Sequence, residues 1–347
     1  MTTNAIQSSH IYSTYFAPRG RSRIYTLGMQ IAQLYLSPFD QIIGFIGEAG
    51  SGKSVLNKTF MGLLDKNGYI DSGSILFEGQ DLTKLKTEKE WEKIRGGRIA
   101  MVMQDPMTCL NPLKTIGWQI AESIRYHQGL KGSEAKAKAI QMLRDVGITD
   151  PERRYRQYPH EFSGGMRQRV AIAIAVACSP KILICDEPTT ALDVTIQAQI
   201  LQLLKELRAK YHLTIVMITH DLGVVANIAD RVAVMYAGDI VEIGTADEIY
   251  YDPRHPYTWA LLSSMPQMGI KGEDLFNIVG TPPNLFAEIR GDAFAPRNPQ
   301  ALKIDYVKRP PYFEVSPTHK AKTWLLDPRA PHIEPPAAVK KLQKEGL

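Results

Sequence analysis

The chain has 347 residues, of which 44% are apolar and 22% are charged, the balance of a globular protein that buries a sizeable core. Its net charge of +5 is mild for this length and singles out neither an acidic partner nor a membrane surface. Three cysteines without ligand spacing exclude a disulfide framework and a zinc site, and they suit a reducing compartment. We see no signal-peptide pattern and no run of about 18 apolar residues, so we expect no membrane span.

Apolar strand runs alternate with helical patterns over the first 250 residues, which predicts an α/β domain. Strands are expected at 41–47, 181–187 and 213–220, and a hairpin is expected at 231–244. Between about 113 and 162 helical patterns predominate, which indicates a helical insertion.

The amino-acid composition changes after about residue 253. Eleven of the 22 prolines fall between Pro282 and Pro336, which favours irregular structure over regular helices and strands. We therefore expect a domain at 1–253, with a helical subdomain at about 113–165, followed by a small loop-rich extension at 254–347.

The segment GEAGSGKS at 47–54 follows the first strand run and fits the pattern G-x-x-x-x-G-K-[ST]. Glycines let backbone N–H groups turn toward phosphates, and the dipole of the following helix faces the same anion. Lys53 supplies a positive charge, and the Ser54 hydroxyl can ligate Mg²⁺. The expected nucleotide-binding residues of this loop are Gly47, Glu48, Ala49, Gly50, Ser51, Gly52, Lys53, Ser54 and Val55.

Two adjacent acids, Asp186 and Glu187, end the strand run at 181–187. We expect Asp186 to hold Mg²⁺, directly or through water, and Glu187 to polarise the attacking water. A second glycine motif, FSGGMRQR, lies upstream at 162–169, where Ser163, Gly164 and Gly165 open a helix. Because one nucleotide does not need two such helix ends from one chain, we expect this motif to complete the site of a second subunit.

Together these motifs resemble the nucleotide-binding subunit of an ATP-binding cassette (ABC) transporter. Residues 47–54 match its Walker A motif, 185–187 close Walker B, and FSGGM matches its signature, with Phe162 and Met166 where Leu and Gln are common. MQDP resembles its glutamine loop, ALD at 191–193 its D-loop, and ITHD its switch histidine. The resemblance implies a P-loop NTPase core with a helical subdomain insertion, which binds ATP and Mg²⁺.

The resemblance also implies roles for single residues. Gln104 would sense Mg²⁺ and the membrane subunit, His220 would contact the γ-phosphate and position water, and Asp193 would communicate across the dimer. An alignment of Ile6 and Ile11 with the first strand of the family places Tyr15 where an aromatic ring stacks on adenine. Tyr12 and Phe16 are alternatives for that role.

Three stretches resemble the oligopeptide and dipeptide importer branch of the family: SGGMRQR, MVMQDPMTCLNP at 101–112 and YYDPRHPYTWALLSSMP at 250–266. The chain resembles the first of two ATPase subunits in such a permease. The resemblance implies a homologous second ATPase subunit, two transmembrane permease subunits and an extracellular peptide-binding protein as partners, and no nucleic acid. It places the protein at the cytoplasmic face of the cell membrane.

Two alternatives remain at this point. One is a soluble cassette ATPase of DNA repair or translation, and the other is a homodimeric importer of a different solute, such as nickel. Only 110 positions separate Lys53 from Ser163, which suits a transporter rather than the long coiled-coil insertion of repair ATPases. The single cassette argues against translation, where two cassettes per chain are usual.

The extension contains GDAFAPRNPQALKID at 291–305. In many members of this branch the pattern G-C-x-F-x-P-R-C-P-x-A, with two further cysteines, resembles a set of iron–sulfur ligands. Here the frame is present at Gly291, Phe294, Pro296, Arg297, Pro299 and Ala301. The ligand positions hold Asp292, Asn298, Asp305 and Thr323. We therefore predict no iron–sulfur cluster and expect a solvated, hydrogen-bonded turn, with a hard cation held by the two Asp residues as the alternative.

Overall fold

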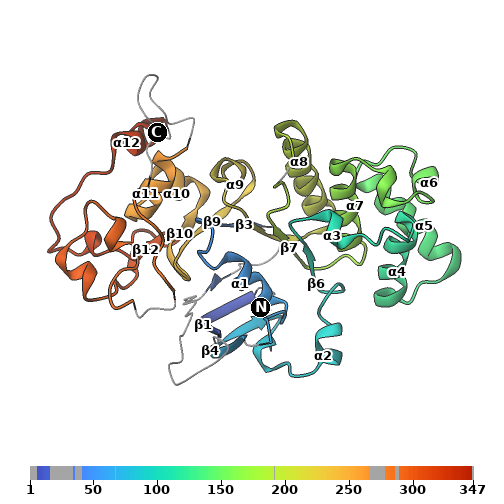
Figure 1. The fold of residues 1–347 in the computed structure, drawn as a ribbon, viewed down its shortest axis with the longest axis horizontal. Helices are drawn as coiled ribbons and strands as arrows, with labels where there is room; N and C mark the ends of the chain where they lie inside the picture. The colour runs from blue at the N-terminus through green and yellow to red at the C-terminus, as the bar shows by residue number, and fades with distance from the viewer. Residues whose placement is uncertain are drawn as a thin grey trace. The chain divides into compact units, whose positions relative to one another are not determined.

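The structure is a computed structural model that describes residues 6–15, 34–35, 41–66, 68–190, 192–265, 278–285 and 289–345. The chain divides into two compact units, and Figure 1 labels their elements. The first unit comprises residues 1–36, 43–83 and 219–347, and the second comprises 37–42 and 84–218.

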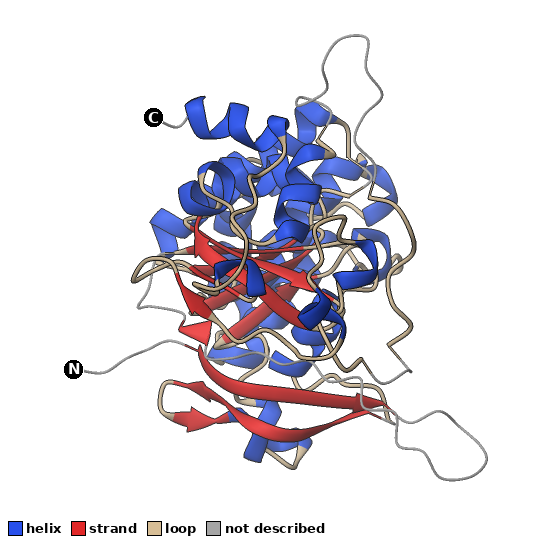
Figure 2. Ribbon diagram, turned by 90° about the vertical axis from the view of Figure 1, so that its left-hand side faces the viewer, coloured by secondary structure: helices blue, strands red, loops and turns tan. Residues whose placement is uncertain are grey.

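A four-stranded antiparallel sheet lies in the first unit, in the order β2–β1–β4–β5. Its strands are β1 (Ile6–Tyr15), β2 (Leu34–Tyr35), β4 (Gly68–Phe77) and β5 (Gln80–Asp81). The long strands β1 and β4 lie side by side (Figure 2) and pair from Ile6–Phe77 to Tyr15–Gly68. The ladder is irregular around Tyr12. The first strand expected from the family alignment is thus confirmed as β1.

A second set of strands in the first unit follows the order β11–β12–β10–β9–β3. Its members are β3 (Ile42–Ile46), β9 (Arg231–Tyr236), β10 (Asp239–Thr245), β11 (Phe313–Glu314) and β12 (Lys320–Ala321). β3 runs parallel to β9 and is buried throughout, as a continuous apolar strand should be. The predicted hairpin is confirmed as β9–β10, whereas β11 and β12 were not predicted.

Among the described residues of this unit, five α-helices accompany the strands: α1 (Lys53–Phe60), α9 (Leu222–Ile228), α10 (Ala246–Tyr251), α11 (Pro256–Ser263) and α12 (Ala337–Glu345). Short 3₁₀ turns lie at η4 (Ala295–Arg297), η5 (Lys303–Tyr306) and η6 (Trp324–Leu326). Figure 1 shows α10, α11 and α12 beside one another.

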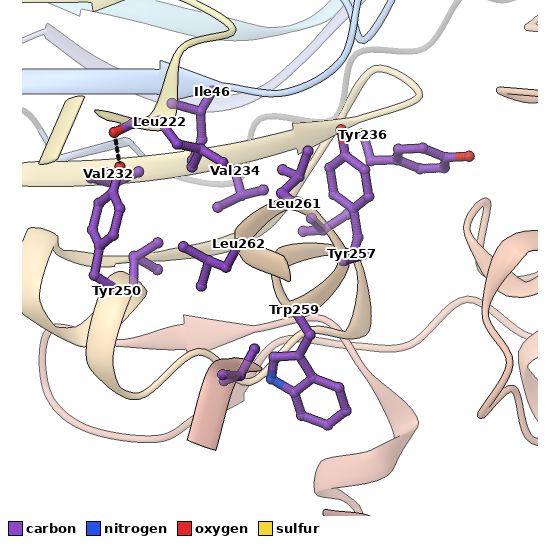
Figure 3. Close-up of a cluster of buried hydrophobic side chains, with 14 of the residues drawn as sticks. Ile46, Leu222, Val232, Val234, Tyr236, Tyr250, Tyr257, Trp259, Leu261 and Leu262 are labelled. Atoms are coloured by element: carbon purple, nitrogen blue, oxygen red, sulfur yellow. Dashed lines mark hydrogen bonds between the residues drawn. The ribbon is translucent and has the colours of Figure 1, made fainter. Parts of the chain in front are cut away.

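One hydrophobic cluster joins distant parts of this unit (Figure 3). Ile46 of β3, Tyr236 of β9 and Tyr257 of α11 belong to it, and the rings of the two tyrosines lie 4.5 Å apart. Phe294 and Val339 from the C-terminal extension belong to the same cluster. The extension therefore shares a core with the strand that leads into the phosphate loop.

The second unit contains three parallel strands in the order β8–β7–β6. They are β6 (Ile99–Val102), β7 (Ile182–Asp186) and β8 (Thr214–Ile218), which confirms the strands expected near 181–187 and 213–220. The α-helices are α2 (Glu88–Glu92), α3 (Pro106–Cys109), α4 (Ile116–Gln128), α5 (Gly132–Asp145), α6 (Pro151–Arg154), α7 (Gly164–Val176) and α8 (Val194–Tyr211). The 3₁₀ turn η2 (Pro159–Glu161) also lies in this unit, and η1 (Leu82–Lys84) spans the point in the sequence where the first unit ends and the second continues.

The predominance of helix predicted between 113 and 162 is confirmed by α4, α5, α6 and η2. The helix α5 buries Ala135, Ala139, Met142 and Leu143, which recur at helical spacing on one face. Within the described part of the chain, no helix combines the length and apolarity needed to cross a membrane.

Candidate nucleotide-binding site

The phosphate loop lies between β3 and α1 and folds around the ammonium group of Lys53. Lys53 Nζ donates to the carbonyl oxygens of Gly47 (2.7 Å) and Glu48 (2.9 Å) and to Ser51 Oγ (3.3 Å). The side chain is buried, and only 5% of the residue is exposed. The loop thereby holds a positive charge beside its own backbone, where phosphate oxygens would replace these acceptors.

The start of α1 is suited to an anion. Its N-cap, Gly52, has a φ of 99°, in the left-handed region that favours glycine, and no side chain caps the helix. No acidic residue lies in its first turn, and Ser54 is exposed. Since the helix dipole is positive at this end, the loop fits nucleotide phosphates, and the Ser54 hydroxyl fits a metal bound to them.

The side chain of Glu48 is held by the C-terminal part of the chain and not by the phosphate loop. Its carboxylate pairs with Arg297, and its backbone N–H donates to the hydroxyl of Tyr257 at 2.8 Å. Ala49 and Gly50 are exposed, and Val55 is half-buried on α1. Sequence reasoning missed the pairing with Arg297 because the two residues are 249 positions apart.

In the second unit, Gln104 and Glu187 come together. Gln104 Nε2 donates to Glu187 Oε2 at 3.0 Å, and Thr190 Oγ1 donates to the same oxygen at 3.0 Å. Glu187 follows Asp186, which ends β7, and its φ of 47° lies in the left-handed region that non-glycine residues rarely adopt. Thr190 was not predicted, although its position three residues after Glu187 in the same loop is a usable signal.

The signature serine and the D-loop aspartate both cap helices. Ser163 Oγ accepts from the N–H of Met166 (3.4 Å) at the start of α7, and Asp193 Oδ1 accepts from that of Ile196 (2.9 Å) at the start of α8. Gly165 leaves no room for a Cβ, which would lie 2.7 Å from Ile196 Cγ2. Gly164 is exposed, and Ala191 of the D-loop lies outside the described residues.

The remaining predicted site residues lie in the first unit. His220 follows β8 and is exposed, and the next residue, Asp221, caps α9 by accepting from the N–H of Val224. Tyr15 is the last residue of β1, and its backbone lies opposite Gly68. The structure does not describe the side chain of Tyr15. Phe16, one of the alternatives, also lies outside it.

The four residues at the expected ligand positions of the cysteine pattern accept hydrogen bonds from neighbouring backbone N–H groups. Asp292 accepts from Phe294 (3.0 Å), Asn298 from Gln300 (3.0 Å), Asp305 from Leu302 (2.6 Å) and Thr323 from Leu325 (3.2 Å). The expected hydrogen bonding is thus confirmed.

The expectation that this turn is solvated is wrong for three of the four residues, because Asn298, Asp305 and Thr323 are at most 8% exposed. The two turns also pack closely against each other. A Cβ on Gly291 would lie 1.9 Å from the carbonyl oxygen of Asp305, which also accepts from the N–H of Asp292. Burial, reinforced by the charges of Asp305 and Asp239, raises the pKa of Asp292 to about 7.

Two of the three cysteines are shielded from solvent. Burial raises the pKa of Cys185 to about 12 and that of Cys178 to about 11. Cys109, at the end of α3, is exposed.

Comparison with known proteins places these features in a class. The family model described as "ABC transporter" matches residues 32–190. The ATP-binding cassette MJ0796, solved as a dimer in a post-hydrolysis state with ADP and Pi, is 27% identical with a TM-score of 0.59, covering 70% of this chain and 98% of that chain. cbiO1 from Clostridium perfringens, part of the cbiONQ transporter complex, is 26% identical with a TM-score of 0.61, covering 72% and 92%. The fold is therefore that of an ABC ATPase cassette.

Known proteins are also similar to this chain in its C-terminal part. The family model described as "Oligopeptide/dipeptide transporter, C-terminal region" matches residues 241–304. The oligopeptide transport ATP-binding protein AmiE of Streptococcus pneumoniae is 59% identical over 87% of this chain and 85% of that protein. OppD of Bacillus subtilis is 57% identical over 88% and 86%, and the dipeptide transport protein DppD of Lactococcus lactis is 57% identical over 85% and 84%. The chain belongs to this family of oligopeptide and dipeptide transport ATP-binding proteins, whose activity is ATP hydrolysis.

Proposed function

We propose that this chain binds and hydrolyses ATP to energise the uptake of oligopeptides or dipeptides across the cytoplasmic membrane. The observation that carries the proposal is the attachment of an oligopeptide/dipeptide transporter C-terminal region to an ABC cassette in one chain. Relatives named for peptide transport match over both regions at 57–59% identity. We propose the division into a nucleotide-binding domain at 1–253, with its helical subdomain at about 113–165, and an extension at 254–347.

The residues of the site would act as follows. The phosphate loop and Lys53 bind the phosphates of ATP, while Tyr15 is the candidate for stacking on adenine. Ser54, Asp186 and Gln104 would hold Mg²⁺, which would neutralise negative charge on the phosphates when bound. Glu187, whose carboxylate is oriented by Gln104 and Thr190, would position and polarise the attacking water with His220.

The partners follow from the architecture of such importers. A homologous second ATPase subunit would receive Ser163, Gly164 and Gly165 at its nucleotide, and Asp193 would lie at the contact between the two subunits. Two transmembrane permease subunits would hold the protein at the cytoplasmic face, and an extracellular binding protein would deliver the peptide. ATP would close the dimer, and hydrolysis would reopen it and move the permease through Gln104 and the helical subdomain.

We propose that the extension holds no iron–sulfur cluster. The positions at which a cluster would need thiolates hold Asp292, Asn298, Asp305 and Thr323, and each side chain bonds a nearby N–H group. Visible absorbance with stoichiometric iron after anaerobic purification would contradict this.

The substitution Glu187→Gln tests the assignment in the assembled transporter. The amide keeps the size of the side chain but cannot act as a base, so turnover should fall by about a hundredfold or more while ATP still binds. ATPase assays, ATP affinity and uptake of a labelled oligopeptide in proteoliposomes would be measured together. Glu206→Gln, on the exposed face of α8, is the matched control.

Three outcomes would reject parts of the proposal. Near-normal turnover in Glu187→Gln would remove Glu187 from catalysis. Uptake of nickel but not of peptide would reject the peptide assignment. ATPase activity that responds to DNA, without association with membrane subunits, would reject the transporter function.

A further inference from the structure

The phosphate loop is tied to the C-terminal extension by one ion pair. Arg297 Nη1 lies 2.6 Å from Glu48 Oε2, and Arg297 Nη2 lies 3.0 Å from Glu48 Oε1. Two parallel N–H···O bonds of this kind fix both distance and orientation, which a single bond does not. Glu48 is the second residue of the loop, so the contact acts directly on the nucleotide-binding segment.

The guanidinium group is fully engaged. Its other N–H groups reach the hydroxyl of Tyr236 (3.2 Å) and the carbonyl oxygens of Val279 (3.2 Å) and Ile278 (3.4 Å). With the two bonds to Glu48, the five N–H donors of an arginine all have acceptors. The Arg297 side chain is 6% exposed, and its bonding to Glu48 raises the pKa of the guanidinium further above its ordinary range. A buried guanidinium group whose N–H donors all have acceptors is held in one position.

Glu48 transmits this restraint to the lysine that binds phosphate. Arg297 holds its carboxylate, Tyr257 accepts from its N–H, and its carbonyl oxygen accepts from Lys53 Nζ. The three contacts involve the side chain, the N–H and the C=O of one residue. A shift of Arg297 would therefore displace the backbone that borders the Lys53 ammonium.

The segment around Arg297 is itself anchored. Phe294 is 1% exposed, and its ring lies 5.2 Å from the rings of both Tyr236 and Tyr257. A cavity of about 300 Å³ separates loop residues 48–51 from the segment 282–285 of the extension. Glu48 is one of the residues that line this cavity, and the ion pair with Arg297 fixes the position of its carboxylate.

We propose that Arg297 is a positioning residue for the phosphate loop, and that the C-terminal extension thereby sets the affinity of the cassette for nucleotide. This inference rests on the proposed function only in taking ATP as the ligand of the loop. The pair acts on Lys53 through the backbone of Glu48, so we expect the effect to fall on nucleotide binding rather than on the chemical step. Removal of the charge of either Arg297 or Glu48 leaves the opposite charge shielded from water without its partner. We expect this to disturb the loop more than removal of both charges does.

The test compares four variants of the full chain: Arg297→Gln, Arg297→Lys, Glu48→Gln and the double variant Arg297→Gln/Glu48→Gln. Binding of MANT-labelled ATP is titrated by fluorescence, and KM and kcat for ATP are measured in the assembled transporter. We expect each Gln variant to weaken nucleotide binding about tenfold, with kcat at saturating ATP much less affected. The double variant should be no weaker than either single one, and Arg297→Lys should lie between them and the wild type.

Arg329→Gln is the matched control, because Arg329 also pairs with an acid in the extension, Asp327, but is exposed. It should leave nucleotide affinity unchanged. The proposal is overturned if Arg297→Gln lowers the melting temperature yet binds MANT-ATP like Arg329→Gln, or if the losses in the double variant add. If Arg297→Gln does not fold, the same comparison of MANT-ATP binding with Arg329→Gln is made for Glu48→Gln, and equal binding overturns the proposal. A failure of peptide transport would leave these affinities unaffected, so it cannot be mistaken for failure of this inference.

Discussion

At the scale of single residues, the phosphate loop buries the ammonium group of Lys53. The groups that accept its hydrogen bonds are mainly backbone carbonyl oxygens of the loop itself. Water does not compensate a buried ammonium group, so its bonds to Gly47 and Glu48 hold the loop closed around it. When phosphate oxygens take over as acceptors, the same charge contributes to nucleotide affinity. Lys53 thus stabilises both the loop and its ligand.

The substitution Lys53→Ala should therefore weaken ATP binding tenfold or more, since a hydrogen bond from a charged group contributes about 1.5–3 kcal/mol. Isothermal titration calorimetry with ATP measures this directly. Lys58→Ala, on the same helix but paired with Asp65 in solvent, is the control and should bind like the wild type. Equal affinity of both variants would remove Lys53 from the site.

At the scale of elements, α10 depends on residues far along the chain. Its N-cap, Thr245, and its third residue, Glu248, form a capping box, and the Glu248 carboxylate also accepts from the hydroxyls of Ser316 and Thr318. Burial opposes ionisation of this carboxyl, but these hydrogen bonds prevail and lower the pKa of Glu248 to about 2. The helix start is therefore fixed by the extension.

A pH dependence follows with a definite sign. The folded-state pKa of Glu248 is below its ordinary value of 4.5, so the carboxylate stabilises the fold above about pH 4.5 and loses that effect as the pH falls toward 2. In Glu248→Gln, stability at neutral pH should fall, and its decline over this acid window should be shallower than in the wild type. Urea midpoints at several pH values measure both, with Asp247→Asn as the neighbouring exposed control. Parallel curves for wild type and Glu248→Gln would refute the assignment.

Elements with strong local patterns could be predicted, and those that depend on distant partners could not. β3 and β8 consist almost entirely of apolar residues and are buried throughout, so their positions followed from the sequence alone. The two-residue strand β12 pairs with β10 on one side and with β11 on the other, and no local pattern marks either short strand. The helix caps at Ser163 and Asp193 are local signals, whereas the pairing of Arg297 with Glu48 depends on the tertiary fold.

At the scale of the whole molecule, the end of the chain supports the beginning of the site. Val339 of α12 is fully buried in the cluster that contains Ile46, the last residue of β3. Packing interactions in one cluster are shared by all of its members. The last described helix is therefore a structural part of the unit that carries the phosphate loop.

The substitution Val339→Ala tests this. It removes two buried methyl groups and should lower the free energy of unfolding by about 2 kcal/mol. Chemical denaturation of the full chain measures the change. Val307→Ala, at a position 71% exposed, removes the same atoms and should change stability by less than about 0.5 kcal/mol. Equal effects of the two would show that α12 does not pack against the core.

The shielding of two thiols makes the unaltered chain suitable for spectroscopy. Burial keeps Cys178 and Cys185 out of reach of a maleimide, and it raises the pKa of these two thiols to about 11 and about 12. Cys109 is exposed and lies five residues after Gln104. A fluorophore or spin label attached to the unmodified protein would therefore report from one known position, beside the segment proposed to move the permease.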